Sequence, residues 1–182
     1  MNIKDAEYLK YQKLVVGKNI NPQTLLATDY LNHFNEIHML LDMLADMPDC
    51  LDDIINWEAI SYQKHFEQSV FQDKDLAIHA YDHVPMRYKL PFEQCVSEMD
   101  ELLINTITSV QKALKDDDIK KVKKIINDYS PKMERLIENC SAIINSKETT
   151  TQQERIDDYF QAEGNDEDNN VIDQNSIDDL FD

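Results

Sequence analysis

Glycine is nearly absent from this chain of 182 residues, which has only Gly17 and Gly164. Strand-rich and α/β folds need glycine for tight turns and phosphate-binding loops. Helices do not need it, and apolar residues recur here at intervals of three and four over long stretches. The sequence therefore predicts an all-α fold, a bundle of five to seven helices over residues 1–145, followed by a disordered acidic tail at 146–182.

The boundaries of the expected helices come from the apolar stripes and from proline, asparagine and glycine positions. The expected helices span residues 5–16, 22–47, 51–57, 62–71, 76–84, 92–114 and 119–144. Asn21 is expected to cap the second helix and Pro48 to end it, while Pro91 is expected to precede the sixth. Ser130 and Pro131 leave two alternatives open, a new helix that begins there or one long helix kinked at the proline.

Negative charge is concentrated in the tail. Residues 146–182 contain twelve acids and two bases, so they carry −10 of the formal net charge of −18. Such a balance disfavours direct binding to nucleic acid or to an anionic membrane, and it favours a partner with a basic pocket. No apolar stretch is long enough to span a bilayer, and the charged N-terminus is unlike a signal peptide. A cytoplasmic protein without a membrane segment is expected.

The chain also lacks the motifs that mark cofactor sites. It contains no P-loop, no GxGxxG and no HExxH. The three cysteines, Cys50, Cys95 and Cys140, have no CxxC spacing and lie among apolar residues, so buried reduced thiols are expected. His79 and His83 are four residues apart and would share a helix face, which can hold a metal ion. Surface histidines are the preferred interpretation, and neither a metal nor a cofactor is predicted.

A short peptide occurs twice near the end of the chain. Residues 153–160 read QERIDDYF and residues 174–181 read QNSIDDLF, an offset of 21 residues. In a helix, the glutamine and the apolar residues of each copy would share one face. These candidate binding residues are Gln153, Ile156, Tyr159 and Phe160 in the first copy and Gln174, Ile177, Leu180 and Phe181 in the second. Each copy could fold into a helix in a partner's groove, or it could pack back onto the bundle.

Both copies resemble the short peptides with which chemotaxis proteins of the FliM and CheZ families bind the receiver protein CheY. Residues 172–182 (IDQNSIDDLFD) are similar to the pattern LSQ-x-x-IDALL/F, and residues 151–160 (TQQERIDDYF) fit the same outline. The resemblance covers the two copies and none of the helical body. It implies binding to a CheY-like receiver, with Ile177, Leu180 and Phe181 as anchors.

The first copy is also similar to the sliding-clamp motif called the PIP box. QERIDDYF fits the pattern Q-x-x-Φ-x-x-aromatic-aromatic at every defined position. The resemblance implies that Gln153 would enter a polar pocket of the clamp. The trio that fills the neighbouring apolar pocket would be Ile156, Tyr159 and Phe160. The second copy departs from this motif at Leu180, so the clamp is kept as the alternative partner.

One further pattern points to chemistry on a receiver. Phosphatases that act on receiver aspartyl-phosphates need an acid and an amide about one helical turn apart, because the amide orients the attacking water and the acid holds a receiver lysine. Asp29 and Asn32 have that spacing and are followed by Glu36 along one helix edge. Asp53 and Asn56 have it too. In a chain so rich in Asp and Asn, solvated helix faces are the other interpretation.

Taken together, these patterns predict a signalling adaptor that has no catalytic activity of its own. The bundle would make one contact, and the tail would present two copies of a helix-forming peptide to a CheY-like receiver. A sliding-clamp accessory protein and a receiver phosphatase remain as alternatives. The long apolar stripes could also support a homodimer.

Overall fold

The computed structural model describes residues 3–146, which belong to one compact unit, Met1–Lys147. Within the described residues the fold is all-α, with seven α-helices, two short 3₁₀ helices and no strand. The predicted fold class is therefore confirmed. The tail at 147–182, and with it both repeated peptides, lies outside the described residues, and the predicted domain boundary at residue 145 stays a prediction.

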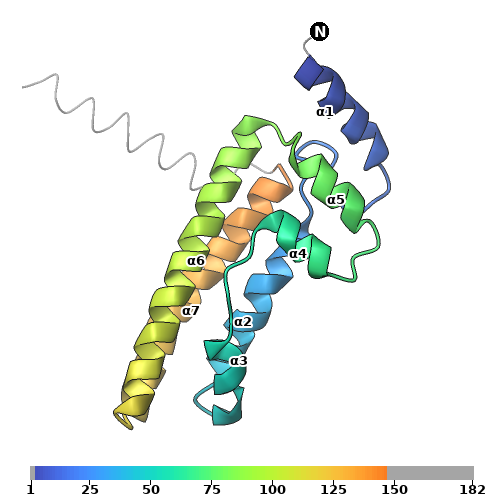
Figure 1. The fold of residues 1–182 in the computed structure, drawn as a ribbon. Helices are drawn as coiled ribbons and strands as arrows, with labels where there is room; N and C mark the ends of the chain where they lie inside the picture. The colour runs from blue at the N-terminus through green and yellow to red at the C-terminus, as the bar shows by residue number, and fades with distance from the viewer. Residues whose placement is uncertain (1–2, 147–182) are drawn as a thin grey trace, which may run out of the picture. The chain divides into compact units, whose positions relative to one another are not determined.

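The elements follow one another along the chain as a series of short helices and a final long pair (Figure 1). They are α1 (Ile3–Leu14), η1 (Thr28–Leu31), α2 (Asn32–Met43), η2 (Pro48–Cys50), α3 (Leu51–Ile55), α4 (Tyr62–Gln68), α5 (Lys74–Tyr81), α6 (Met86–Lys115) and α7 (Ile119–Ile144).

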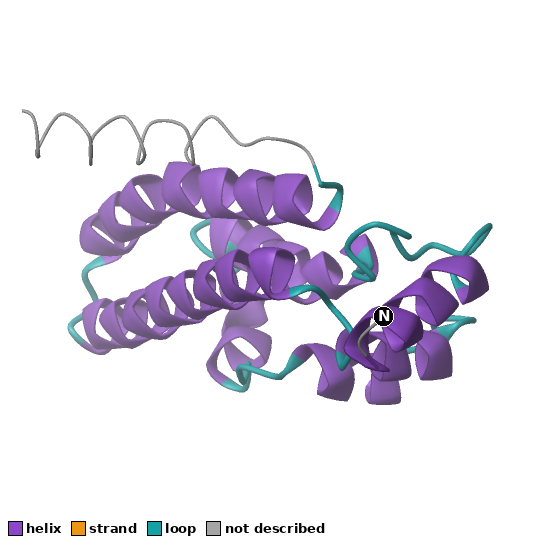
Figure 2. Ribbon diagram, turned by 90° about the horizontal axis from the view of Figure 1, so that it is seen from above, coloured by secondary structure: helices purple, strands orange, loops and turns teal. Residues whose placement is uncertain are grey.

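Helices α6 and α7 form a long antiparallel hairpin, and Figures 1 and 2 show them side by side. The turn between them is tight because Asp117 takes a positive φ of 54°. Asp118 then caps α7, since its carboxylate Oδ1 accepts the N–H of Lys121 at 3.0 Å. The hairpin is the frame against which η1, α2 and α3 pack.

The shorter elements share one core with the hairpin. η1 and α2 pack against α7, and α4 pairs with α5. Large side chains from these elements are fully buried, among them Tyr30, Phe34, Phe66, Met99 and Met133. Because they come from η1, α2, α4, α6 and α7 in turn, burial of a single apolar cluster positions all five elements.

The expected helix at 22–47 is only partly right. Helix α2 covers its second half, and residues 21–27 are not helical. Asn21 does act as a cap, but of a turn: its Oδ1 accepts the N–H groups of Gln23 and Thr24 at 2.8 and 3.1 Å. Leu25 then takes a positive φ of 62°, which a helix does not allow. The helix ends at Met43, well before Pro48.

The irregular segment at 21–27 is held against the end of α7. The Thr24 hydroxyl donates a buried hydrogen bond to the Ile144 carbonyl at 2.6 Å. The Ser146 hydroxyl donates to the Gln23 side-chain oxygen at 2.9 Å. The backbone of the segment is paired within itself, since the Leu25 N–H donates to the Asn21 carbonyl at 2.7 Å and the Asn21 N–H donates to the Leu26 carbonyl at 2.8 Å.

The prolines do not mark helix starts in the way expected. The prediction that a helix begins after Pro91 is wrong, because α6 begins at Met86 and contains Pro91. At the other site, α7 is a single helix that contains Pro131, so the one-helix alternative is confirmed. Proline leaves the carbonyl four residues earlier, at Asn127, without an N–H partner. Pro131 is exposed, so that carbonyl lies on the side of the helix open to water.

The short helices exist where expected, but their ends differ by a few residues. Polar side chains explain two of these ends. The Asn56 amide donates to the Asp52 carbonyl at 2.7 Å, just after α3. The Ser69 hydroxyl donates to the Phe66 carbonyl at 3.1 Å and accepts the Phe71 N–H at 3.2 Å. Such local bonds compete with the next helical turn and end it.

Two further expectations concern the thiols and the membrane. The three cysteines are free and buried, as predicted. The sequence argument found no membrane span, and among residues 3–146 no helix is long and apolar enough to cross a membrane.

Candidate functional site

Asp29 and Asn32, the acid and amide that the sequence singled out, line the same pocket. Asp29 lies in η1, and Asn32 and Glu36 lie on α2, so the pair spans the junction of two elements and not one α-helix as expected. The hollow has an accessible volume of about 570 Å³ and is bounded on its other side by α4 and the residues that follow it. We call it the acid–histidine pocket; it is lined by Asp29, Asn32, Glu36, Ile60, His65, Gln68, Ser69, Val70 and Phe71.

Three rings, which we call the ring stack, join this pocket to its surroundings: His65 from its lining, His33 and Trp57. His33 stacks on Trp57 with ring centroids 5.1 Å apart and lies 6.3 Å from His65. The Nε2 atom of His33 and the indole nitrogen of Trp57 are buried, and neither has a hydrogen-bond partner among the described residues. Burial, reinforced by the neighbouring His65, lowers the pKa of His33 to about 4. Burial also lowers the pKa of His65, although the Asp29 carbonyl and the nearby acids oppose that shift.

We expect the lowered pKa of His33 to make the fold sensitive to acid. The unfolded chain takes up a proton at His33 below about pH 6.5, whereas the folded protein resists it until about pH 4. Stability from this residue is therefore lost as the pH falls between those values, by about 1–2 kcal/mol after allowance for partial exposure. Chemical denaturation between pH 7 and pH 4.5 should show a smaller loss in His33→Gln than in the wild type.

The control for this experiment is the exposed His79. His79→Gln removes a histidine without touching the ring stack, so it should keep the wild-type pH dependence. Equal pH dependence in His33→Gln and in the wild type would contradict the assignment.

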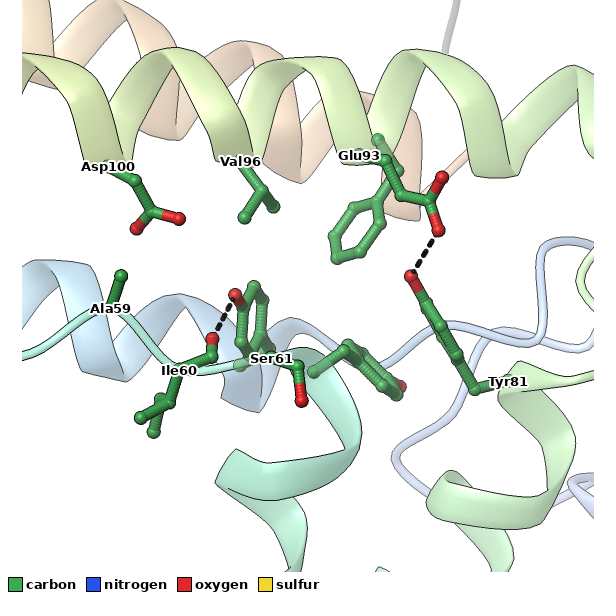
Figure 3. Close-up of a pocket in the computed structure, with 10 residues that line it drawn as sticks. Ala59, Ile60, Ser61, Tyr81, Glu93, Val96 and Asp100 are labelled. Atoms are coloured by element: carbon green, nitrogen blue, oxygen red, sulfur yellow. Dashed lines mark hydrogen bonds between the residues drawn. The ribbon is translucent and has the colours of Figure 1, made fainter.

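A second hollow lies between α6 and the segment that leads into α4 (Figure 3). Its accessible volume is about 340 Å³. We call it the aromatic pocket, and its lining residues are Tyr30, Ala59, Ile60, Ser61, Tyr62, Tyr81, Phe92, Glu93, Val96 and Asp100. Two hydrogen bonds fix its walls: the Tyr30 hydroxyl donates to the Ile60 carbonyl at 2.9 Å, and the Tyr81 hydroxyl donates to Glu93 at 2.9 Å.

Asp100 is the most unusual group in the aromatic pocket. One of its carboxylate oxygens, Oδ1, is buried and has no hydrogen-bond partner among the described residues. Burial raises the pKa of Asp100 to about 6. The sequence did not indicate this residue, because a single Asp within a long amphipathic helix has the same pattern as the other polar residues on its exposed face.

The histidines that suggested a metal face do not share a helix face. Helix α5 ends at Tyr81, so His83 lies beyond it. The ring of His83 stacks on Tyr11 with centroids 4.6 Å apart. The Nδ1 atom of His79 lies 2.6 Å from the Asp75 carbonyl. No group of three or more His, Cys, Asp or Glu side chains within residues 3–146 is arranged to hold a metal ion.

The other pair with phosphatase-like spacing lies away from both pockets. Asp53 and Asn56 are exposed, and neither lines the acid–histidine pocket or the aromatic pocket. Asn56 is engaged in ending α3. The eight candidate binding residues of the tail lie outside the described residues, so their roles stay predictions.

Comparison with known proteins found no relative: no family model matches the chain, and no curated protein or solved structure matches it. What the protein does must therefore be inferred from its own residues.

Proposed function

We propose that the protein is a cytoplasmic, non-catalytic signalling adaptor that binds a CheY-like receiver domain through its two tail peptides. The observation that carries this proposal is the recurrence of Gln, Ile, Asp, Asp and Phe in residues 153–160 and 174–181. Both copies follow the compact unit that ends at Lys147. Two weak peptides on one tether raise each other's local concentration, so together they can hold an oligomeric partner firmly.

The experiment that tests this proposal is a titration of the full-length chain against a CheY-like receiver, with and without phosphorylation, and against a sliding clamp from the same organism. We expect binding to the receiver at about micromolar or tighter, with an affinity that changes on phosphorylation. Binding to the clamp alone would support the PIP-box alternative and refute the receiver. Binding to neither would refute both.

A second candidate function is dephosphorylation of the receiver. It is favoured by one observation, that Asp29, Asn32 and Glu36 line the same pocket. The exposed Asn32 amide would orient a water molecule toward the aspartyl-phosphate, and Asp29 would hold a receiver lysine.

Loss of the amide should abolish most of any phosphatase activity. A positioned side chain that assists proton transfer or orients water contributes about 100-fold or more to a rate. Asn32→Ala should therefore slow receiver dephosphorylation by about 100-fold, while binding through the tail is retained. The measurement is loss of labelled phosphate from the receiver over time.

Asn35→Ala is the matched control, because Asn35 is exposed on α2 and does not line the pocket. It should leave the dephosphorylation rate unchanged. A wild-type protein that does not accelerate dephosphorylation, or an equal effect of both substitutions, would rule this candidate out.

A further inference from the structure

Two of the three thiols are neighbours across the α6–α7 hairpin. Cys95 lies on α6 and Cys140 on α7, toward the end of the hairpin opposite its turn. The Cys95 thiol donates a hydrogen bond to the Leu136 carbonyl at 3.3 Å, and Leu136 lies about one helical turn before Cys140. The Cys140 thiol is itself hydrogen-bonded to Cys95. Two oxidisable sulfur atoms from two different helices therefore lie together in the core.

The two thiols differ in their access to water. Cys140 is fully buried, whereas Cys95 keeps 6% of its surface exposed. The hydrogen bond to Cys95 and, after it, burial raise the pKa of the Cys140 thiol, so Cys140 stays protonated. Because the thiolate is the form that oxidants attack, Cys95 is the thiol expected to react first. Cys140 lies next to it in the position of a second, resolving thiol.

The first turns of α6 offer a route to Cys95. Pro91 lies one turn before Cys95 and has no N–H, so the Arg87 carbonyl lacks its usual helical partner and this part of the helix is weakened. Met86 and Leu90 in the same turns are exposed, so little apolar surface holds these turns in place. Segments with few buried contacts open locally at the lowest cost in free energy. Such an opening admits a small oxidant to Cys95 without unfolding the rest of the body.

We propose that Cys95 and Cys140 form a redox switch, in which hydrogen peroxide converts the neighbouring thiols into a disulfide that ties α6 to α7. The Cys95 sulfur attacks the O–O bond, which breaks, and it becomes a sulfenic acid as one water leaves. The Cys140 sulfur then displaces the hydroxyl group as a second water, and the S–S bond forms. Two thiols thus lose two electrons and two protons, and one hydrogen peroxide is reduced to two water molecules. The switch is separate from the tail peptides, so it does not depend on receiver binding.

The experiment treats the full-length protein with hydrogen peroxide in the absence of denaturant and measures its intact mass and its melting temperature. We expect the mass to fall by about 2 Da, and the peptides that contain Cys95 and Cys140 to be recovered joined to each other. The melting temperature should rise by about 5 °C or more, because the link closes a long loop in the unfolded chain. Dithiothreitol should reverse both changes.

Serine substitutions make the test specific. Cys95→Ser and Cys140→Ser should each abolish the cross-link and the rise in melting temperature. Cys50→Ser is the matched control, since Cys50 is a buried thiol in η2, and it should keep both. The mass of the wild-type protein tests the proposal even where a variant fails to fold. A gain of about 16 or 32 Da without a cross-link, a cross-link through Cys50, thiols that stay reduced, or cross-linking only in denaturant would overturn the proposal.

Discussion

Replacing Ile177 and Phe181 with alanine should lower the affinity of the full-length chain for a CheY-like receiver by roughly several hundred-fold. The two residues are four positions apart, so in a bound helix they would lie on one face, one turn from each other. Buried apolar anchors of this kind contribute about 2 kcal/mol each, and about 1.4 kcal/mol corresponds to a tenfold change in affinity. Titration of a labelled receiver with the wild-type and variant chains measures the effect.

Asn175→Ala is the matched control for the second copy. In a helix, Asn175 would lie on the face opposite Ile177 and Phe181, and its replacement leaves the charge unchanged. It should therefore bind like the wild type. An equal loss in the control would mean that the peptide does not present one apolar face.

The first copy separates the two partners. A sliding clamp should lose most affinity when Tyr159 and Phe160 are replaced, and it should also lose affinity on Gln153→Ala. A receiver held mainly by the second copy should be affected less by these changes than by Ile177→Ala with Phe181→Ala. If the clamp depends on residues 174–181 instead, the PIP-box interpretation fails.

The apolar stripes predicted the long helices because their spacing matches the helical period and their residues form the core. Phe34, Ile37 and Leu41 on α2 are buried as expected, and so are Met99 and Leu103 on α6. Long periodic stretches carry enough repeats to identify a helix from the sequence alone. Fold class and the main helices could therefore be predicted.

The apolar stripe at 22–47 extends beyond the helix that it predicted. Leu26 continues the spacing of α2 and is buried, yet it lies in an irregular segment. Periodicity reports burial, and a turn can bury a side chain at the same spacing as a helix does. The side chain of Asn21 accepts hydrogen bonds from the N–H groups of Gln23 and Thr24, and these bonds stabilise a turn. By sequence alone, an asparagine that caps a turn looks the same as one that caps a helix.

The candidate sites were only partly predictable for a related reason. Asp29 and Asn32 are close in sequence, so their spacing of about one helical turn was enough to predict that their side chains are neighbours. The ring stack joins His33, Trp57 and His65 from three separate elements, and only the tertiary fold makes them neighbours. The same is true of Asp100, whose significance depends on the rings that α4 and α5 place opposite it.

Phe34→Ala should destabilise the body by about 3–5 kcal/mol, because it removes a fully buried ring and leaves a cavity. Phe34 contacts Tyr30 with ring centroids 5.6 Å apart in an edge-to-face arrangement, and it lies 5.3 Å from His33. A loss of this size is a large part of the 5–15 kcal/mol that typically holds a domain together. Urea unfolding followed by circular dichroism measures the change in free energy of unfolding.

Met39→Ala on the same helix is the control, since Met39 is 55% exposed and its loss should change stability by no more than about 0.5 kcal/mol. A loss below about 1 kcal/mol for Phe34→Ala would show that the ring does not pack as described. Phe34 also bears on both pockets, because its neighbours Tyr30 and His33 belong to the aromatic pocket and to the ring stack of the acid–histidine pocket. A smaller substitution at Phe34 that leaves the protein folded should therefore also change the acid sensitivity that His33 gives to the fold.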